Sequence, residues 1–93
     1  MRTTRRTAQF KRDWRRETRG QDPTRLVKAL GEIVSMLAED RPLPARCRDH
    51  ALSGPWRDFR DCHVRPDLIL IYRKPNEALL DLVRLGSHSE LSL

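Results

Sequence analysis

Residues 56–86 decide the fold, and they read WRDFRDCHVRPDLILIYRKPNEALLDLVRLG. Three strand-like runs lie within them: Trp56–Val64, Leu68–Arg73 and Ala78–Leu85. The connections at 65–67 and 74–77 are short and contain proline, which favours antiparallel hairpins. The middle run is apolar at nearly every position, which predicts a central strand buried on both faces.

A short strand and a helix are predicted at the N-terminus. Residues 2–8 contain three threonines and are compatible with a strand. From Phe10 to about Arg19 the spacing is helical, because Phe10 and Trp14 lie one turn apart, and Gly20 ends the helix.

A second helix is predicted from Asp22, as the capping carboxylate, and Pro23, at the first helical position, to about Glu39. Its apolar residues recur at helical spacing and form one core-facing stripe: Leu26, Val27, Leu30, Ile33, Val34 and Leu37. The predicted fold class is therefore α+β, a small antiparallel β-sheet with two N-terminal helices packed on one face. Residues 1–93 are expected to form a single domain.

Positive charge is concentrated at the N-terminus. Residues 1–20 hold eight Lys and Arg against Asp13 and Glu17, so this segment carries the whole net charge of +6. Arginine predominates, and its fork-shaped guanidinium suits phosphate and carboxylate groups. The pattern favours contact with RNA or an acidic protein over a face that serves only solubility. If the partner is RNA, binding should weaken steeply with salt.

The composition indicates a cytoplasmic protein without a membrane span. The longest apolar run, Leu68–Tyr72, is five residues, and no apolar stretch follows the basic N-terminus as in a secretory signal. Cys47 and Cys62 are therefore expected to be buried thiols in a reducing cytosol. No CxxC or HxxxH spacing is present, so neither a metal nor a cofactor is expected.

The three histidines of the chain, His50, His63 and His88, all lie in its second half, and Asp67 follows the middle one by four residues. Histidine both takes and gives a proton near neutrality. Three of them with a carboxylate in a basic protein suggest acid–base chemistry on an anionic substrate. The alternative is three unrelated surface histidines. Successive side chains of a strand point to opposite faces. One face of this strand therefore carries Phe59, Asp61 and His63, and the other carries Arg60, Cys62 and Val64.

Three segments resemble the YafQ-type toxins of the RelE/ParE superfamily: LPARCRDHALSGPW (43–56), RDCHVRPDLILIY (60–72) and RLGSHSEL (84–91). They contain every histidine, whereas the N-terminal half agrees only in the order and length of its helices. The resemblance implies the toxin of a type II toxin–antitoxin pair, an endoribonuclease that cuts mRNA in the ribosomal A site without metal. It also implies a cognate DinJ-like antitoxin that wraps the toxin with an acidic segment in a hetero-oligomer.

The same resemblance implies catalytic roles for His50, His63, Asp67 and His88. RNA supplies its own nucleophile, the 2′-OH, so the enzyme needs a base, an acid for the departing 5′-oxygen and positive charge for the phosphorane. We expect His88 to be the acid, with His50 or His63 and Asp67 on the base side. The alternatives are a structural role for His63 and a turn role for Asp67.

Arg60 and Arg84 are the candidates for substrate binding through the phosphate. Their alternative role is an ion pair with Asp58, Asp61 or Asp81. Trp14 and Trp56 are expected to pack in the core.

The sequence departs from the family pattern at two positions. Ser92 follows Leu91 where other members carry an aromatic residue, which bears on a base-stacking contact, and Ala51 stands in place of a proline. Two other functions fit the composition. ParE-type relatives share the fold but act on DNA gyrase, and a basic module would bind nucleic acid or an acidic chain without cutting. The histidine pattern favours the nuclease.

Overall fold

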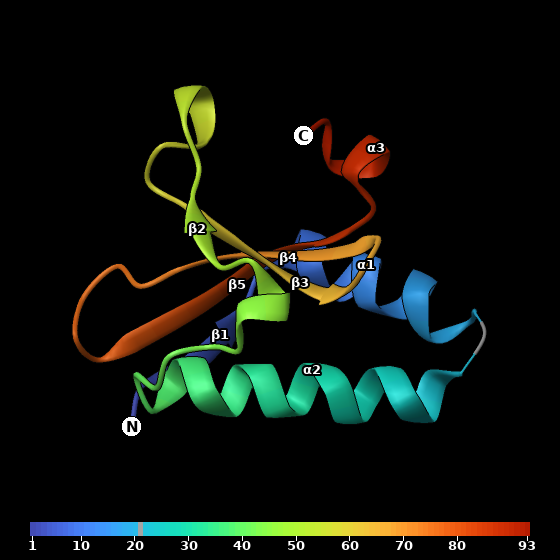
Figure 1. The fold of residues 1–93 in the computed structure, drawn as a ribbon, viewed down its shortest axis with the longest axis horizontal. Helices are drawn as coiled ribbons and strands as arrows, with labels where there is room; N and C mark the ends of the chain where they lie inside the picture. The colour runs from blue at the N-terminus through green and yellow to red at the C-terminus, as the bar shows by residue number, and fades with distance from the viewer. Residues whose placement is uncertain (21) are drawn as a thin grey trace.

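The computed structural model describes residues 1–20 and 22–93. Its elements are, in chain order, β1 (Thr3–Arg6), α1 (Ala8–Thr18), α2 (Pro23–Ala38), the 3-10 turn η1 (Ala45–Cys47), β2 (His50–Ala51), the 3-10 turn η2 (Gly54–Trp56), β3 (Arg60–Arg65), β4 (Leu68–Arg73), β5 (Leu79–Gly86) and α3 (His88–Leu91). Helix α2 lies along one side of the sheet, while α3 and the segment with η2 rise from the other side (Figure 1). The predicted α+β class is confirmed.

The sheet is mixed rather than wholly antiparallel, with the strand order β1-β5-β4-β3-β2. The pairs β3–β4 and β4–β5 are antiparallel, as the short connections predicted. The short strand β2, which was not predicted, is also antiparallel to β3. Strand β1, however, runs parallel to β5. No turn joins these two strands, so the direction of β1 follows from where the chain goes next. It leads through Thr7 into α1, which packs along β5.

The main core lies between the helices and one face of the sheet. Its buried apolar residues come from both helices and the three longest strands: Phe10, Leu26, Leu30, Ile33, Leu37, Leu70, Tyr72, Leu80, Leu82 and Leu85, among others. Most of the predicted stripe on α2 is therefore buried. Val27 is the exception at 53% exposed, because it lies at the edge of the stripe.

Helix α2 begins where it was predicted to begin, but its first turn is not capped by the Asp22 side chain. Pro23 does open the helix, but the Asp22 side chain makes no capping hydrogen bond. The backbone of Asp22 is left-handed, with a φ of 54°, and its carbonyl oxygen accepts from the Leu26 amide. The predicted cap assumed an extended backbone at Asp22, the geometry that lets a carboxylate reach the first free amides.

Strand β4 is buried on both faces, as predicted. Ile69 and Ile71 point away from the helices and pack against Leu91 of α3 and against apolar residues of the β2–β3 connection. The segment after Gly86 forms helix α3. Ser87 accepts a hydrogen bond from the Glu90 amide, and the Glu90 carboxylate accepts one from the Ser87 amide. This reciprocal capping makes a helix of four residues possible.

Helix α1 completes the edge of β5 where β1 ends. Beyond the register of β1, the Thr7 hydroxyl donates to the Val83 carbonyl at 2.8 Å. The Leu85 amide donates to Asp13 Oδ2 at 3.0 Å, and Arg16 donates to the Leu85 carbonyl at 2.9 Å. Side chains of α1 thus satisfy backbone groups that would otherwise form an open sheet edge.

Both cysteines are buried free thiols, as predicted. Cys62 belongs to the helix-side core, and burial raises the pKa of its thiol. A thiol that resists ionisation is a poor nucleophile, although it neighbours His63 in sequence. Within the two described ranges, no helix is both long and apolar enough to cross a membrane.

Candidate active site

His50 lies in β2 directly opposite Asp61 of β3. Its Nδ1 is 2.6 Å from the Arg48 carbonyl oxygen and 3.2 Å from Asp61 Oδ1. A carbonyl oxygen only accepts hydrogen bonds, so the neutral ring carries its hydrogen on Nδ1. Its Nε2 is then the nitrogen that can accept a proton.

His63 and His88 are in contact although they lie far apart in the sequence. His63 projects from β3 beside the irregularity that shifts the β3–β4 register, and His88 is the first residue of α3. Their ring centroids are 5.4 Å apart, with an angle of 64° between the planes. This edge-to-face pair places two proton-transfer groups side by side.

Asp67 lies in the turn between β3 and β4 and is largely exposed. Its Oδ1 is 3.5 Å from Nδ1 of His88, at the outer limit of a hydrogen bond. We had expected Asp67 on the side of the base. Its neighbour is instead His88, the expected acid, because the β3–β4 turn approaches α3 and not β2.

Asp61, a carboxylate outside the predicted site, has all three histidines near enough to act on its charge. Asp61 is 4% exposed, and within the described part of the chain its Oδ1 has no hydrogen-bond partner of good geometry. Burial raises the pKa of Asp61, while positive charge on His50, His63 or His88 would lower it. The predicted strand alternation already placed Asp61 on the face of His63; what was missing was the position of β2 and α3 over that face.

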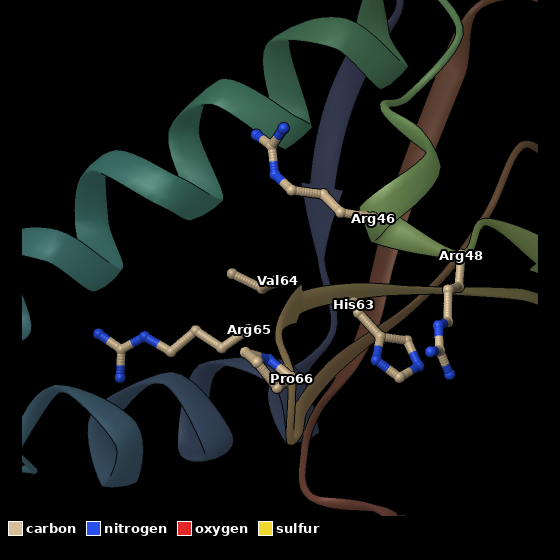
Figure 2. Close-up of a pocket in the computed structure, with 6 residues that line it drawn as sticks. All are labelled: Arg46, Arg48, His63, Val64, Arg65 and Pro66. Atoms are coloured by element: carbon tan, nitrogen blue, oxygen red, sulfur yellow. The ribbon is translucent and has the colours of Figure 1, made fainter.

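Two neighbouring hollows open at these residues. His50, Asp61 and His88 line one of about 440 Å³, together with Trp56, Leu93 and smaller residues of the β2–β3 connection and the C-terminus. His63 lines a second hollow of about 480 Å³ with arginines of the η1 region and of β3 (Figure 2). His63 lines one hollow and His88 the other, so the contacting histidine pair lies between them.

The arginines proposed for substrate binding lie elsewhere. Arg60 points to the helix side of β3, where its Nε is 3.3 Å from both Asp49 Oδ1 and the Tyr72 hydroxyl. Arg84 binds the buried Asp13 of α1, with 2.8 Å between Nε and Oδ2. Both form ion pairs, though with partners other than those considered. Their placement does not support phosphate contact.

Both tryptophans pack against a neighbouring aromatic ring. Trp14 stacks on Phe10 against the core, as expected. Trp56 packs edge-on against Phe59, and it also forms part of the wall of the first hollow. Among the residues that the structure describes, no three His, Cys, Asp or Glu side chains are grouped to hold a metal ion.

A family model described as "Bacterial toxin of type II toxin-antitoxin system, YafQ" matches residues 2–93. The mRNA interferase toxin YafQ of Escherichia coli strain K12 is 42% identical over 66 residues, which cover 70% of this chain and 71% of the relative.

Solved structures agree over almost the whole chain. A metal-bound toxin from Helicobacter pylori superposes with a TM-score of 0.86 at 43% identity, covering 98% of this chain and 99% of that one. The toxin in the E. coli DinJ-YafQ complex gives a TM-score of 0.80 at 35% identity, with 97% and 96% covered.

Proposed function

This chain belongs to the YafQ family of toxins from bacterial type II toxin–antitoxin systems, and we propose that it is an mRNA interferase acting through His50, His63, Asp67 and His88. The observation that carries this proposal is the convergence of three histidines from β2, β3 and α3 on one side of the sheet. RNA cleavage by its own 2′-OH needs two proton transfers, each worth roughly 10²–10⁴-fold, and this arrangement supplies the groups for both without a metal.

His50 is the base in this mechanism. The Arg48 carbonyl holds the hydrogen on Nδ1, so Nε2 faces the substrate as an acceptor for the 2′-OH proton. As this proton leaves, the 2′-oxygen attacks phosphorus and the bond to the 5′-oxygen breaks. Asp61 lies 3.2 Å behind the ring and stabilises the imidazolium that forms.

His88 is the acid and protonates the departing 5′-oxygen. Asp67 orients it by accepting from Nδ1, which leaves Nε2 to deliver the proton. His63 packs edge-on against His88 and fixes the ring plane. In its protonated form it also supplies positive charge to the phosphorane.

The partner is a cognate DinJ-like antitoxin. Solved relatives include complexes of YafQ with DinJ. Helix α1 of this chain carries the exposed basic residues Lys11, Arg12 and Arg15, and the exposed Arg19 follows directly after the helix. An acidic antitoxin segment complements this surface, so the affinity should fall with rising salt. The substrate is mRNA in the ribosomal A site, which places the toxin in the cytoplasm.

The decisive experiment replaces His88 by Ala and follows mRNA cleavage on translating ribosomes. We expect cleavage to fall by at least about a hundredfold, because the leaving oxygen loses its proton donor. Folding should be unchanged, since the His88 side chain is about half exposed. Ser89→Ala, an exposed neighbour on the same helix, is the matched control and should cleave like the wild type.

Three results would contradict the proposal. Full cleavage by His88→Ala would remove this residue from the mechanism. Inhibition of DNA gyrase, or RNA binding without cutting by the wild type, would assign the chain to a ParE-like inhibitor or a binding module.

A further inference from the structure

The second hollow has a strongly basic lining. Arg46 and Arg48 belong to η1 and its end, Arg65 ends β3, and His63, Val64 and Pro66 complete the wall. Figure 2 shows Arg48 extending beside the His63 ring, whereas Arg46 and Arg65 extend towards the helices. None of these six lining residues is acidic.

The charges of this hollow are largely free for a ligand. The Arg65 guanidinium donates to the Asp22 backbone carbonyl at 3.1 Å, which leaves its charge uncompensated. Within residues 1–20 and 22–93, neither Arg46 nor Arg48 forms an ion pair. Arg60 and Arg84 differ, because carboxylates neutralise both. Three uncompensated guanidinium groups around one concave surface favour an anion.

Arg48 joins this hollow to the catalytic histidines. Its backbone is left-handed, with a φ of 48°, a conformation that residues other than Gly, Asn and Asp rarely adopt. Its carbonyl lies against His50 Nδ1, while its side chain lines the hollow beside His63. One residue thus contributes to both sites.

We propose that the hollow lined by Arg46, Arg48 and Arg65 binds the phosphate backbone of the RNA strand next to the scissile phosphate, with Val64 and Pro66 packing against a ribose or base. This inference rests on the proposed function, and it adds a subsite that holds the strand in register. Arginine matches phosphate in a two-pronged geometry, and a hollow of about 480 Å³ lies in the range of small-ligand pockets. His63 lines this hollow and His88 lines the first, so a strand that crosses the contacting histidine pair reaches both.

The test measures RNA binding, not cleavage. A fluorescein-labelled single-stranded oligoribonucleotide of mixed sequence is titrated with protein at several salt concentrations, all in the His88→Ala background. The variants are Arg46→Gln, Arg65→Gln and Arg48→Asn, the last because asparagine tolerates the left-handed backbone. Arg48→Lys keeps the charge, and Lys28→Gln, which removes an exposed positive charge on α2, is the control outside the hollow. Circular dichroism verifies that each variant is folded.

Each loss of a phosphate contact should weaken binding and make the slope of log K against log salt shallower by about 0.7. Arg48→Lys should retain the slope of the His88→Ala parent, and Lys28→Gln should change neither quantity. Unchanged affinity and slope in all three variants would overturn the subsite. So would unchanged RNA binding with weakened antitoxin binding, since the hollow would then serve the antitoxin. RNA binding tests the subsite, and RNA cleavage by the wild type tests the proposed function. The failure of one proposal can therefore be told from the failure of the other.

Discussion

At the scale of single residues, the most informative side chain is Asp61. A buried carboxylate normally has a hydrogen-bonded or charged partner. Asp61 has the His50 ring at 3.2 Å and the other two histidines near enough to act on its charge. Burial nevertheless prevails and raises the pKa of Asp61. A negative charge on Asp61 at neutral pH therefore lowers the stability of the fold, while it favours the protonated form of the neighbouring histidines.

Asp61→Asn should keep or raise the stability of the protein and lower its rate of RNA cleavage. A raised folded pKa means that the contribution of Asp61 to stability is greatest below the ordinary value of 3.8 and is lost as pH rises through the folded value. The Asn variant should therefore be at least as stable as the wild type at pH 7 by urea denaturation, yet cleave at least about tenfold more slowly (~1.4 kcal/mol).

The pH profile separates this role from a purely structural one. Removing a negative charge disfavours protonated histidine, so the acidic limb of the rate profile should move to lower pH. Asp58→Asn, on the exposed connection before β3, is the control and should leave the profile in place. An unshifted profile in Asp61→Asn would show that its charge does not act on the histidines.

At the scale of elements, α3 shows how a very short helix is held. Its ends are fixed by the Ser87–Glu90 capping box and by burial of Leu91 against β4. Gly86 allows the close approach, since a Cβ there would lie 3.2 Å from the Arg16 guanidinium and 3.3 Å from the Leu91 side chain. The position of His88 therefore depends on its neighbours in this segment more than on contacts of its own.

Ser87→Ala should loosen α3 without unfolding the protein. Loss of the capping hydroxyl costs about 1 kcal/mol, and the amides of Leu91, Ser92 and Leu93 bond back to carbonyls within this segment. Hydrogen exchange at these three amides should accelerate, and cleavage should fall severalfold because His88 is less well placed. Ser89→Ala should change neither. Unchanged exchange in Ser87→Ala would mean that Leu91 packing alone holds the helix.

At the scale of the whole molecule, Asp13 connects the N-terminal half to the sheet. It is fully buried and accepts hydrogen bonds from Gln9, the Leu85 amide and Arg84. Burial raises its pKa, but these donors outweigh burial and the net shift is downward. The charged form of Asp13 is thus the one that the folded protein stabilises.

Asp13→Leu should destabilise the protein by about 3 kcal/mol in urea denaturation, because Arg84 loses its partner in a low-dielectric environment. A lowered folded pKa contributes stability above the ordinary value of 3.8, and this contribution is lost as pH falls through the folded pKa. The variant should therefore show a weaker loss of stability in acid than the wild type. Glu32→Gln, an exposed carboxylate on α2, is the control and should behave like the wild type.

Combining Asp13→Leu with Arg84→Met tests the pairing directly. The double variant should recover much of the lost stability, since an apolar pair replaces the buried ion pair. Equal destabilisation in the single and double variants would show that the Leu85 amide, and not Arg84, is the important partner.

The sequence by itself determined the elements whose signals are local: the apolar run of β4, the hairpin turns beside it, and the spacing of Leu26, Leu30, Ile33 and Leu37 in α2. It also determined the family, because three segments in order carry all the histidines. Only the tertiary structure decided the parallel direction of β1, the left-handed backbone of Asp22 and the placement of Asp67 beside the expected acid, His88, and not beside the base. The same holds for the burial of Asp61 under three histidines, and for the ion pairs that occupy Arg60 and Arg84 while Arg46, Arg48 and Arg65 face an open hollow. Hydrophobic periodicity acts between neighbours along the chain, whereas a charge finds its partner by distance in space, which is fixed only when remote strands and helices have packed.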